Sequence, residues 1–255
     1  MAKVVLVYSE KGGVGKTTTT FSISNFLASA GLKVLMIDLD PNNSLTSHCV
    51  SDINQVAGRT IKEVLNGEVQ PITAQIKIRD NLYIIGALKT LTKLEKDQSD
   101  NPDQFLILKD RIAEIENSYD YIILDAPPAS NLITKAALIS ANIVIIPTKL
   151  EQFDTSSVSG VFSEINRCAR QRNGIPFEKL FILPTFYEER NSVNAMFLEA
   201  LNKKYSGMVS QTYIHKATAV SKANISPDSF LDPKSRAYAE YKSVVKEMLQ
   251  VDLYE

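Results

Sequence analysis

The sequence predicts an α/β protein with a doubly wound, mostly parallel sheet flanked by helices. Short runs of β-branched and aliphatic residues alternate with longer stretches of helical periodicity, which is the pattern of consecutive strand–helix units. Most of the short runs are apolar at every position, as in strands that are buried on both faces. The predicted strands are Val4–Tyr8, Val34–Asp38, Leu82–Ile85, Tyr121–Asp125, Ile143–Ile146 and Leu180–Leu183.

The predicted helices follow these strands along the chain. Gly31 and Gly174 mark the ends of two of them, because glycine is favoured directly after a helix. No repeat, low-complexity tract or linker rich in proline and serine interrupts the pattern, so we expect residues 1–255 to form a single domain. The predicted helices are Thr17–Ala30, Asp103–Glu116, Leu132–Ser140, Asp154–Arg172, Ser192–Tyr205 and Ser235–Gln250.

The composition excludes several classes of protein. Apolar residues make up 44% and charged residues 22% of the 255, which is typical of a globular chain and not of a disordered one. The formal net charge is −1, so any nucleic-acid surface must be local. Cys49 and Cys168 are too few for a disulfide framework or a four-ligand zinc site. No apolar run approaches the ~20 residues of a membrane span, and no signal sequence precedes the first strand. We therefore expect a soluble cytoplasmic protein.

A glycine-rich loop joins the first predicted strand to the first predicted helix. Glycines let the backbone N–H groups point inward, and the helix N-terminus adds partial positive charge, so such a loop binds polyphosphate. Lys16 would contact the β- and γ-phosphates, and the Thr17 hydroxyl would bind Mg²⁺. The loop departs from the spacing G-x-x-x-x-G-K-[ST], because Glu10 stands where that pattern has glycine. The loop reads Ser9-Glu10-Lys11-Gly12-Gly13-Val14-Gly15-Lys16-Thr17-Thr18.

Two other predicted strands end in aspartates. Strand alternation puts Asp38 and Asp40 on the same side, at the edge where open α/β sheets bind ligands. The alternative is that both only form a turn after the strand. Asp125 follows an apolar strand, as does a Walker B aspartate that binds Mg²⁺ through a water.

The loop Lys11–Thr18 resembles the deviant Walker A motif of the ParA/MinD group of P-loop ATPases. Residues 125–128, Asp-Ala-Pro-Pro, are similar to the Asp-x-Pro-Pro of the same group, and the resemblance extends over nearly the whole chain. It implies that ATP and Mg²⁺ bind at residues 11–18. It also implies that Lys11 reaches the partner's nucleotide in an ATP-sandwich homodimer, where a cation would neutralise charge on the transferred phosphoryl group.

The resemblance also implies roles for residues outside the loop. Asp40 would orient the attacking water near the metal, Asp38 would lie in the outer shell of the metal, and Asp125 would bind a metal-bound water. Relatives have their adenine pocket after a late strand, which suggests Thr185 and Phe186 near the base. Core packing is the alternative for Phe186, since aromatic side chains after strands usually bury area.

The C-terminal part is locally basic. Residues 203–246 contain eight basic and three acidic side chains, and a two-fold dimer would double this excess, which suits sequence-independent binding to DNA phosphates. Solvated helix faces are the alternative explanation. Residues 232–236, Asp-Pro-Lys-Ser-Arg, resemble a C-terminal segment of ParA proteins, whereas His215 and Lys216 stand where relatives often have Pro-Arg. The predicted DNA-binding residues are Lys203, Lys204, Lys216, Lys222, Lys234, Arg236 and Lys242.

The resemblance therefore implies a small ParA-type ATPase without an N-terminal helix-turn-helix. Such a protein dimerises with ATP, binds DNA nonspecifically on the nucleoid and hydrolyses ATP when a ParB-like protein stimulates it, which positions a plasmid, chromosome or other cargo. One alternative is a MinD-like switch at a membrane or protein scaffold, although the last residues, 251–255, are acidic and no membrane partner is expected. Another is a relative of the nitrogenase iron protein. That protein binds its cluster through paired cysteines, and Cys49 and Cys168 of this sequence do not stand at the matching places.

Overall fold

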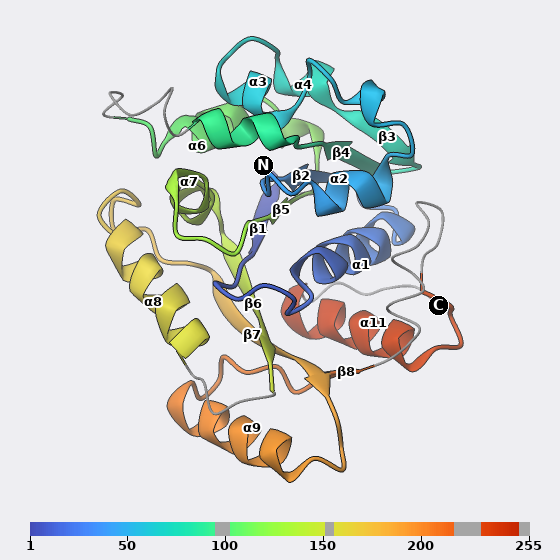
Figure 1. Ribbon diagram of the computed structural model, residues 1–255, viewed down its shortest axis with the longest axis vertical. Coiled ribbons are helices and arrows are strands. Elements are labelled where there is room, and N and C mark those ends of the chain that lie inside the picture. The colour runs from blue at the N-terminus through green and yellow to red at the C-terminus, as the bar shows by residue number, and fades with distance from the viewer. Residues whose placement is uncertain (95–102, 151–155, 217–230, 250–255) are drawn as a thin grey trace.

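The computed structural model describes residues 1–94, 103–150, 156–216 and 231–249, which form an α/β sandwich around one eight-stranded sheet (Figure 1). The strand order is β3-β4-β2-β5-β1-β6-β7-β8. All neighbouring strands are parallel except β3 and β4, which confirms the predicted fold class. The strands are β1 Lys3–Val7, β2 Val34–Asp38, β3 Ile76–Arg79, β4 Leu82–Ile85, β5 Tyr121–Asp125, β6 Ile143–Lys149, β7 Lys179–Tyr187 and β8 Ile214–His215.

Helices cover both faces of the sheet. Helices α1, α2 and α11 pack on one face, where α1 and α11 lie side by side, and α7 and α8 cover the opposite face with α3 and α6 (Figure 1). None of the helices in the described ranges is long and apolar enough to cross a bilayer. The helices are α1 Lys16–Ser29, α2 Ser44–Cys49, α3 Ile61–Leu65, α4 Pro71–Ala74, α6 Ile107–Ala113, α7 Leu132–Ser140, α8 Ser156–Cys168, α9 Ser192–Lys204 and α11 Arg236–Leu249; short 3₁₀ turns span Ile53–Gln55, Lys89–Lys93 and Glu116–Ser118.

The central strands contribute to two hydrophobic cores at once. In β1, Val4 and Leu6 point into the core beneath α7 and α8, whereas Val5 and Val7 point into the core beneath α1 and α11. All four side chains are almost completely buried. Because successive side chains of a strand leave on opposite faces, a strand covered on both sides must be apolar throughout. This is the pattern from which the strands were predicted.

All six predicted strands are present, and the sequence missed the two outermost ones. Strand β3 lies at one edge of the sheet, and it alternates apolar residues with the exposed Lys77 and Arg79, so it lacks the apolar run of a central strand. Strand β8 has only two residues. Strand β7 continues beyond its predicted end, Leu183, and includes Pro184. On the β8 side, Ile182 pairs with Val209 and Thr185 pairs with Ile214, and Pro184 lies between these two pairings. Proline is tolerated there because no β8 residue pairs with it.

The predicted helices are present. Leu132–Ser140 has its predicted bounds, Thr17–Ala30 is shifted by one residue, and the others are shorter in the part of the chain that the structure describes, where the prediction also missed three short helices. The segment predicted as Asp103–Glu116 is helical only over Ile107–Ala113. Helices α2, α3 and α4 have six residues or fewer, too few to show helical periodicity in a sequence. Of these, α2 matters most, because it follows Asp40 and forms one wall of the candidate site.

Candidate functional site

The glycine-rich loop lies at the carboxyl edge of the sheet, between the end of β1 and the start of α1. Gly13 and Gly15 have positive φ angles of 70° and 88°, which residues with a side chain rarely adopt. A Cβ atom at Gly12 or Gly13 would meet none of the described residues within 4 Å, so both glycines border open space in that part of the chain. Among the residues that the structure describes, no side chain caps the first turn of α1. Its backbone N–H groups are therefore directed at a site that suits an anion.

A cavity of about 610 Å³ adjoins this loop. It brings together the loop, the segment that follows β2 and Pro128 beyond β5, which are far apart in the sequence but meet where strand order reverses. The sequence missed the wall formed by Asn42, Ser44, Ser47 and His48, since α2 gave no periodic signal; only their place directly after Asp40 pointed to them. The cavity is lined by Gly12, Gly13, Gly15, Lys16, Thr17, Thr18, Asp40, Asn42, Ser44, Ser47, His48 and Pro128.

Lys16 is folded back onto its own loop. Its side chain is mostly buried, and its Nζ donates a hydrogen bond of 2.9 Å to the carbonyl oxygen of Lys11. Burial lowers the pKa of Lys16, while the nearby carboxylates Asp125 and Asp40 oppose that effect. A buried ammonium group that has one neutral acceptor among the described residues gains from an anion. Phosphate oxygens in the cavity would supply one.

Asp125 is buried at the end of β5, where two hydroxyl groups donate to it. Thr17 Oγ1 lies 2.8 Å from Oδ2 and Thr20 Oγ1 lies 3.1 Å from Oδ1. Burial, followed by repulsion from Asp38, raises the pKa of Asp125 to about 8. The two aspartates are direct neighbours across the β2–β5 pairing. Two buried carboxylates side by side favour a nearby cation.

Asp38 holds the segment that follows it. Its Oδ1 accepts a hydrogen bond from the N–H of Asp40 at 3.0 Å, and its Oδ2 accepts two from Thr46, from the N–H at 2.9 Å and from Oγ1 at 2.7 Å. The Thr46 hydroxyl in turn accepts the N–H of Ala87 at 2.8 Å. Burial raises the pKa of Asp38 to about 6. These bonds tie the end of β2 to the start of α2 and to the chain beyond β4, and so fix the loop that carries Asp40.

Asp40 differs from both buried aspartates. Its side chain is half-buried and lines the cavity, and Oδ1 accepts the N–H of Asn42 at 2.9 Å. It therefore stands where a carboxylate can meet solvent water and a phosphate in the same cavity.

The donor set fits Mg²⁺. The Thr17 hydroxyl and the carboxylates of Asp40 and Asp125 are hard oxygen ligands, which Mg²⁺ prefers. Within the described ranges no group of three or more His, Cys, Asp or Glu side chains could hold a metal. A site with few protein ligands suits Mg²⁺, which keeps waters and binds substrate phosphates. Bound there, the ion would offset phosphate charge.

Thr185 and Phe186 lie against the loop and do not line the cavity. Thr185 is buried, and its Oγ1 donates to the carbonyl oxygen of Val14 at 3.0 Å. Phe186 has a positive φ of 55°, and its Cε2 lies 3.8 Å from where a Cβ on Gly15 would be. The Lys149 ammonium lies 5.0 Å from the centre of its ring. Both residues support the loop, and their contact with adenine stays a prediction.

The described residues among those predicted to bind DNA lie on α9, directly after β8, directly before α11 and on α11. Lys203, Lys204, Lys216, Lys234 and Arg236 are exposed, and Lys242 is half-buried. Lys222 lies outside the described residues.

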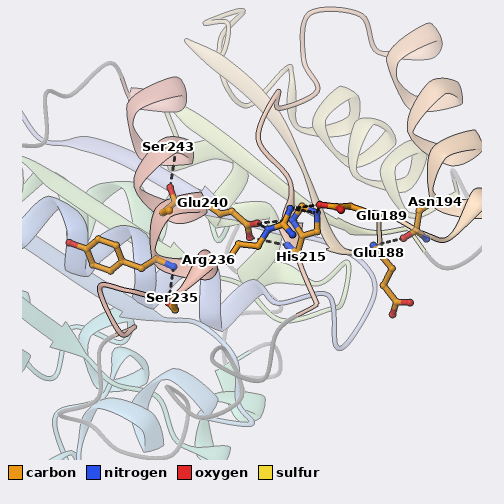
Figure 2. A network of polar contacts seen from close by, with 10 residues as sticks. Glu188, Glu189, Asn194, His215, Ser235, Arg236, Glu240 and Ser243 are labelled. Carbon is orange, nitrogen blue, oxygen red and sulfur yellow. Dashed lines mark hydrogen bonds and ion pairs between the residues drawn. The ribbon is translucent and has the colours of Figure 1, made fainter.

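The charge count over residues 203–246 missed two carboxylates from an earlier segment, which lie beside this basic region. Glu188 pairs with Lys216 and Glu189 pairs with Arg236 (Figure 2 shows the latter). The same loop carries the exposed Arg190. The pairing of β7 with β8 and the packing of α11 against β8 bring these residues together, and β8 was not predicted.

Comparison with known proteins identifies the family. Residues 2–175 match the family model AAA_31, described as an AAA domain. The chromosome-partitioning ATPase Soj of Treponema pallidum is 27% identical over 257 residues, which cover 99% of each chain. The chain belongs to the ParA/MinD family of P-loop ATPases.

Solved structures of other proteins share the fold of this ParA/MinD-family ATPase. A putative plasmid partition protein from Borrelia burgdorferi B31, bound to AMPPNP, is 26% identical with a TM-score of 0.84, covering 98% of this chain and 99% of that one. Cobyrinic acid a,c-diamide synthase from Mycobacterium smegmatis, with bound ADP and magnesium, is also 26% identical, with a TM-score of 0.85 and coverage of 98% and 95%. The names differ, so the fold by itself does not decide the task.

Proposed function

We propose that this ParA/MinD-family protein is a ParA-type partition ATPase. It binds ATP with Mg²⁺, forms a homodimer that encloses the nucleotides, binds duplex DNA without sequence preference and hydrolyses ATP when a ParB-like partner stimulates it. The observation that carries the proposal is the meeting of Lys16, Thr17 and Asp40 around one cavity, with the buried Asp125 hydrogen-bonded to Thr17. The names of the relatives, a chromosome-partitioning ATPase and a plasmid partition protein, favour partition over other tasks of the fold.

The residues divide the work of phosphoryl transfer to water. Lys16 would exchange the Lys11 carbonyl for phosphate oxygens, and the Thr17 hydroxyl oxygen would hold Mg²⁺, which would offset phosphate charge. Asp125 would help to hold the ion through a water, while Asp38 keeps the Asp40 loop in place. Asp40 orients the attacking water, since it is the aspartate of the three that borders the cavity.

Lys11 acts from the partner subunit in this proposal. It lies at the start of the loop, half-buried, and its own carbonyl already accepts Lys16. A cation that enters from outside would neutralise charge on the γ-phosphoryl group as an arginine finger does. Hydrolysis would then require the dimer, which makes ATP binding and DNA release successive states of one cycle.

DNA binding is assigned to the exposed cations of α9, β8 and α11. Such contacts are sequence-independent, and they place the protein on the nucleoid in the cytoplasm. The alternative, a MinD-like switch that inserts its last helix into a membrane, would need an apolar face on α11. Val244, Val245 and Met248 are buried in the core beneath α1, so that stripe is already covered.

The test is binding to a random-sequence duplex at fixed low salt, with ATP, with ADP and without nucleotide, followed by a salt titration. Tight binding that needs ATP and weakens steeply with salt supports the proposal. Absence of binding, while ATP still dimerises the protein, overturns the DNA part and favours a scaffold or membrane role.

A further inference from the structure

A polar cluster joins the end of β7, β8 and the start of α11 (Figure 2). His215 Nδ1 lies 2.6 Å from Glu240 Oε1, and the backbone N–H of His215 donates to Glu240 Oε2 at 3.0 Å. Arg236 Nε donates to the same Oε1 at 2.7 Å. Glu240 is nearly buried, so these bonds fix the Arg236 side chain above β8.

The outer edge of the cluster is made by two consecutive glutamates. Arg236 Nη2 donates to Glu189 Oε1 at 2.6 Å, and Lys216 Nζ donates to Glu188 Oε1 at 2.9 Å. The loop that carries them is anchored, because the Glu188 N–H donates to Asn194 Oδ1 at 2.7 Å and the Lys216 N–H to the Tyr187 carbonyl at 3.2 Å. Two predicted DNA-binding cations are therefore neutralised by carboxylates of one anchored loop.

The inner and outer ion pairs of Arg236 differ in exposure. Glu240 has a side-chain exposure of 10%, whereas Glu189 has 63% and Arg236 itself 55%. The hydrogen bond from Arg236 contributes most to lowering the pKa of Glu189, so the pair is formed between charged groups. Pairs this exposed are weak and screened by salt, so a phosphate can replace the carboxylate. The inner bond to Glu240 would keep Arg236 oriented during that exchange.

We propose that Glu188 and Glu189 form an acidic clamp, which competes with DNA phosphates for Lys216 and Arg236 and thereby holds down the affinity for DNA. The clamp rests on the proposed function, because its competitor is the duplex assigned to this face. A cation paired with an internal carboxylate adds nothing to net attraction for DNA until the carboxylate moves away. The clamp thus makes DNA binding weak enough to be reversed when the dimer separates.

The experiment compares affinities for a random-sequence duplex in ATP at one salt concentration. Glu189→Gln is expected to bind about threefold tighter, and Glu188→Gln combined with Glu189→Gln about tenfold tighter, because two cations are released to the phosphates. The slope of log affinity against log salt is expected to steepen by about one per released cation. The control is Glu199→Gln, which removes an exposed carboxylate of α9 that makes no ion pair among the described residues.

Double-mutant cycles separate a clamp from a general change in charge. With Arg236→Ala in the background, Glu189→Gln is expected to give no gain. The cycle of Lys216→Ala with Glu188→Gln repeats the test on two exposed side chains and leaves Glu240 undisturbed.

The outcomes separate the two proposals. Equal gains with and without the cation, or a gain matched by Glu199→Gln, overturn the clamp and leave DNA binding standing. Failure of every variant to bind duplex, while ATP still binds, overturns the proposed function and the clamp with it.

Discussion

Two regions of the molecule hold titratable side chains for a phosphate ligand in opposite ways. One is the nucleotide edge, the carboxyl edge of the sheet with the glycine-rich loop, and the other is the face formed by β8 and α11. At the nucleotide edge Asp38 and Asp125 are fully buried, and their partners are neutral hydroxyl and N–H groups. On the other face Arg236 and Lys216 are exposed, and their partners are carboxylates. In the first region a ligand must therefore replace neutral partners around buried titratable groups, whereas in the second the charges are already balanced and a ligand must compete.

This contrast sets the size of the effects to be expected from substitutions. Charges in a dry site interact strongly, so the loss of one partner leaves another uncompensated. Charges in water are screened, so each contributes little and several add up. We expect abrupt losses at the nucleotide edge and graded changes on the DNA face.

The largest effect is expected for Lys16→Ala. It removes the buried ammonium group that would face the phosphates, so ATP affinity should fall by roughly 100-fold or more. The measurement is calorimetric titration with ATP and Mg²⁺. Lys109→Ala, which removes an exposed lysine of α6, is the matched control. A Lys16→Ala protein that binds ATP normally would show that the buried charge of Lys16 does not dominate ATP binding, contrary to the difference drawn between the two regions.

Asp40→Ala should spare binding and abolish turnover. Asp40 borders the cavity but makes no bond that holds the glycine-rich loop in the described residues, so ATP should still bind and dimerise the protein. Hydrolysis should fall by roughly 100-fold, as for the loss of a water-orienting carboxylate. Phosphate release and gel filtration in ATP measure the two properties. Normal turnover would remove Asp40 from the mechanism.

Asp125→Asn should stabilise the protein while it removes Mg²⁺-dependent hydrolysis. In the metal-free fold the pKa of Asp125 is raised from 3.8 to about 8. Between these two pH values the folded protein keeps the proton on Asp125, whereas the unfolded chain has lost it. Wild-type stability is therefore lost as pH rises from about 4 to about 8. Asparagine has no such loss, and the variant should be more stable at pH 8 by about 1–3 kcal/mol.

Denaturant unfolding with EDTA and without nucleotide, over that pH range, checks this prediction. Asp110→Asn, an exposed aspartate of α6, should leave the pH profile unchanged. If wild type and Asp125→Asn lose stability in parallel, burial of Asp125 does not carry the cost assigned to it.

The smallest effects should separate clamped from unclamped cations. Lys203 has no ion pair among the described residues, whereas Lys216 pairs with Glu188. Lys203→Gln should weaken duplex binding about threefold, and Lys216→Gln by less than about twofold, because Lys216 is already neutralised. Anisotropy titrations at two salt concentrations measure both. The reverse order would show that position on the face, and not the clamp, decides each contribution.

Much of the nucleotide edge could be predicted because its signals are local. The glycines, Lys16 and Thr17 are consecutive, and each aspartate directly follows an apolar run that is long enough to identify a strand. Parallel strands then bring those ends to one edge by topology alone. What the sequence could not supply was the wall from Asn42 to His48, and the use of Asp38 to fasten Thr46 and Ala87, because both depend on a six-residue helix without a periodic pattern.

The sequence alone determined the sheet, the glycine-rich loop and the aspartates at the carboxyl edge of the sheet. A strand buried on both faces and a phosphate-binding loop each require a run of particular residues. Only the tertiary structure decided which basic side chains face solvent unopposed. Glu188 and Glu189 meet Lys216 and Arg236 across 28 and 47 residues of chain, because β7 pairs with a two-residue strand and α11 packs against that strand. The sequence does not indicate which residue an exposed charged side chain will pair with, because water solvates such a side chain at any position on the surface.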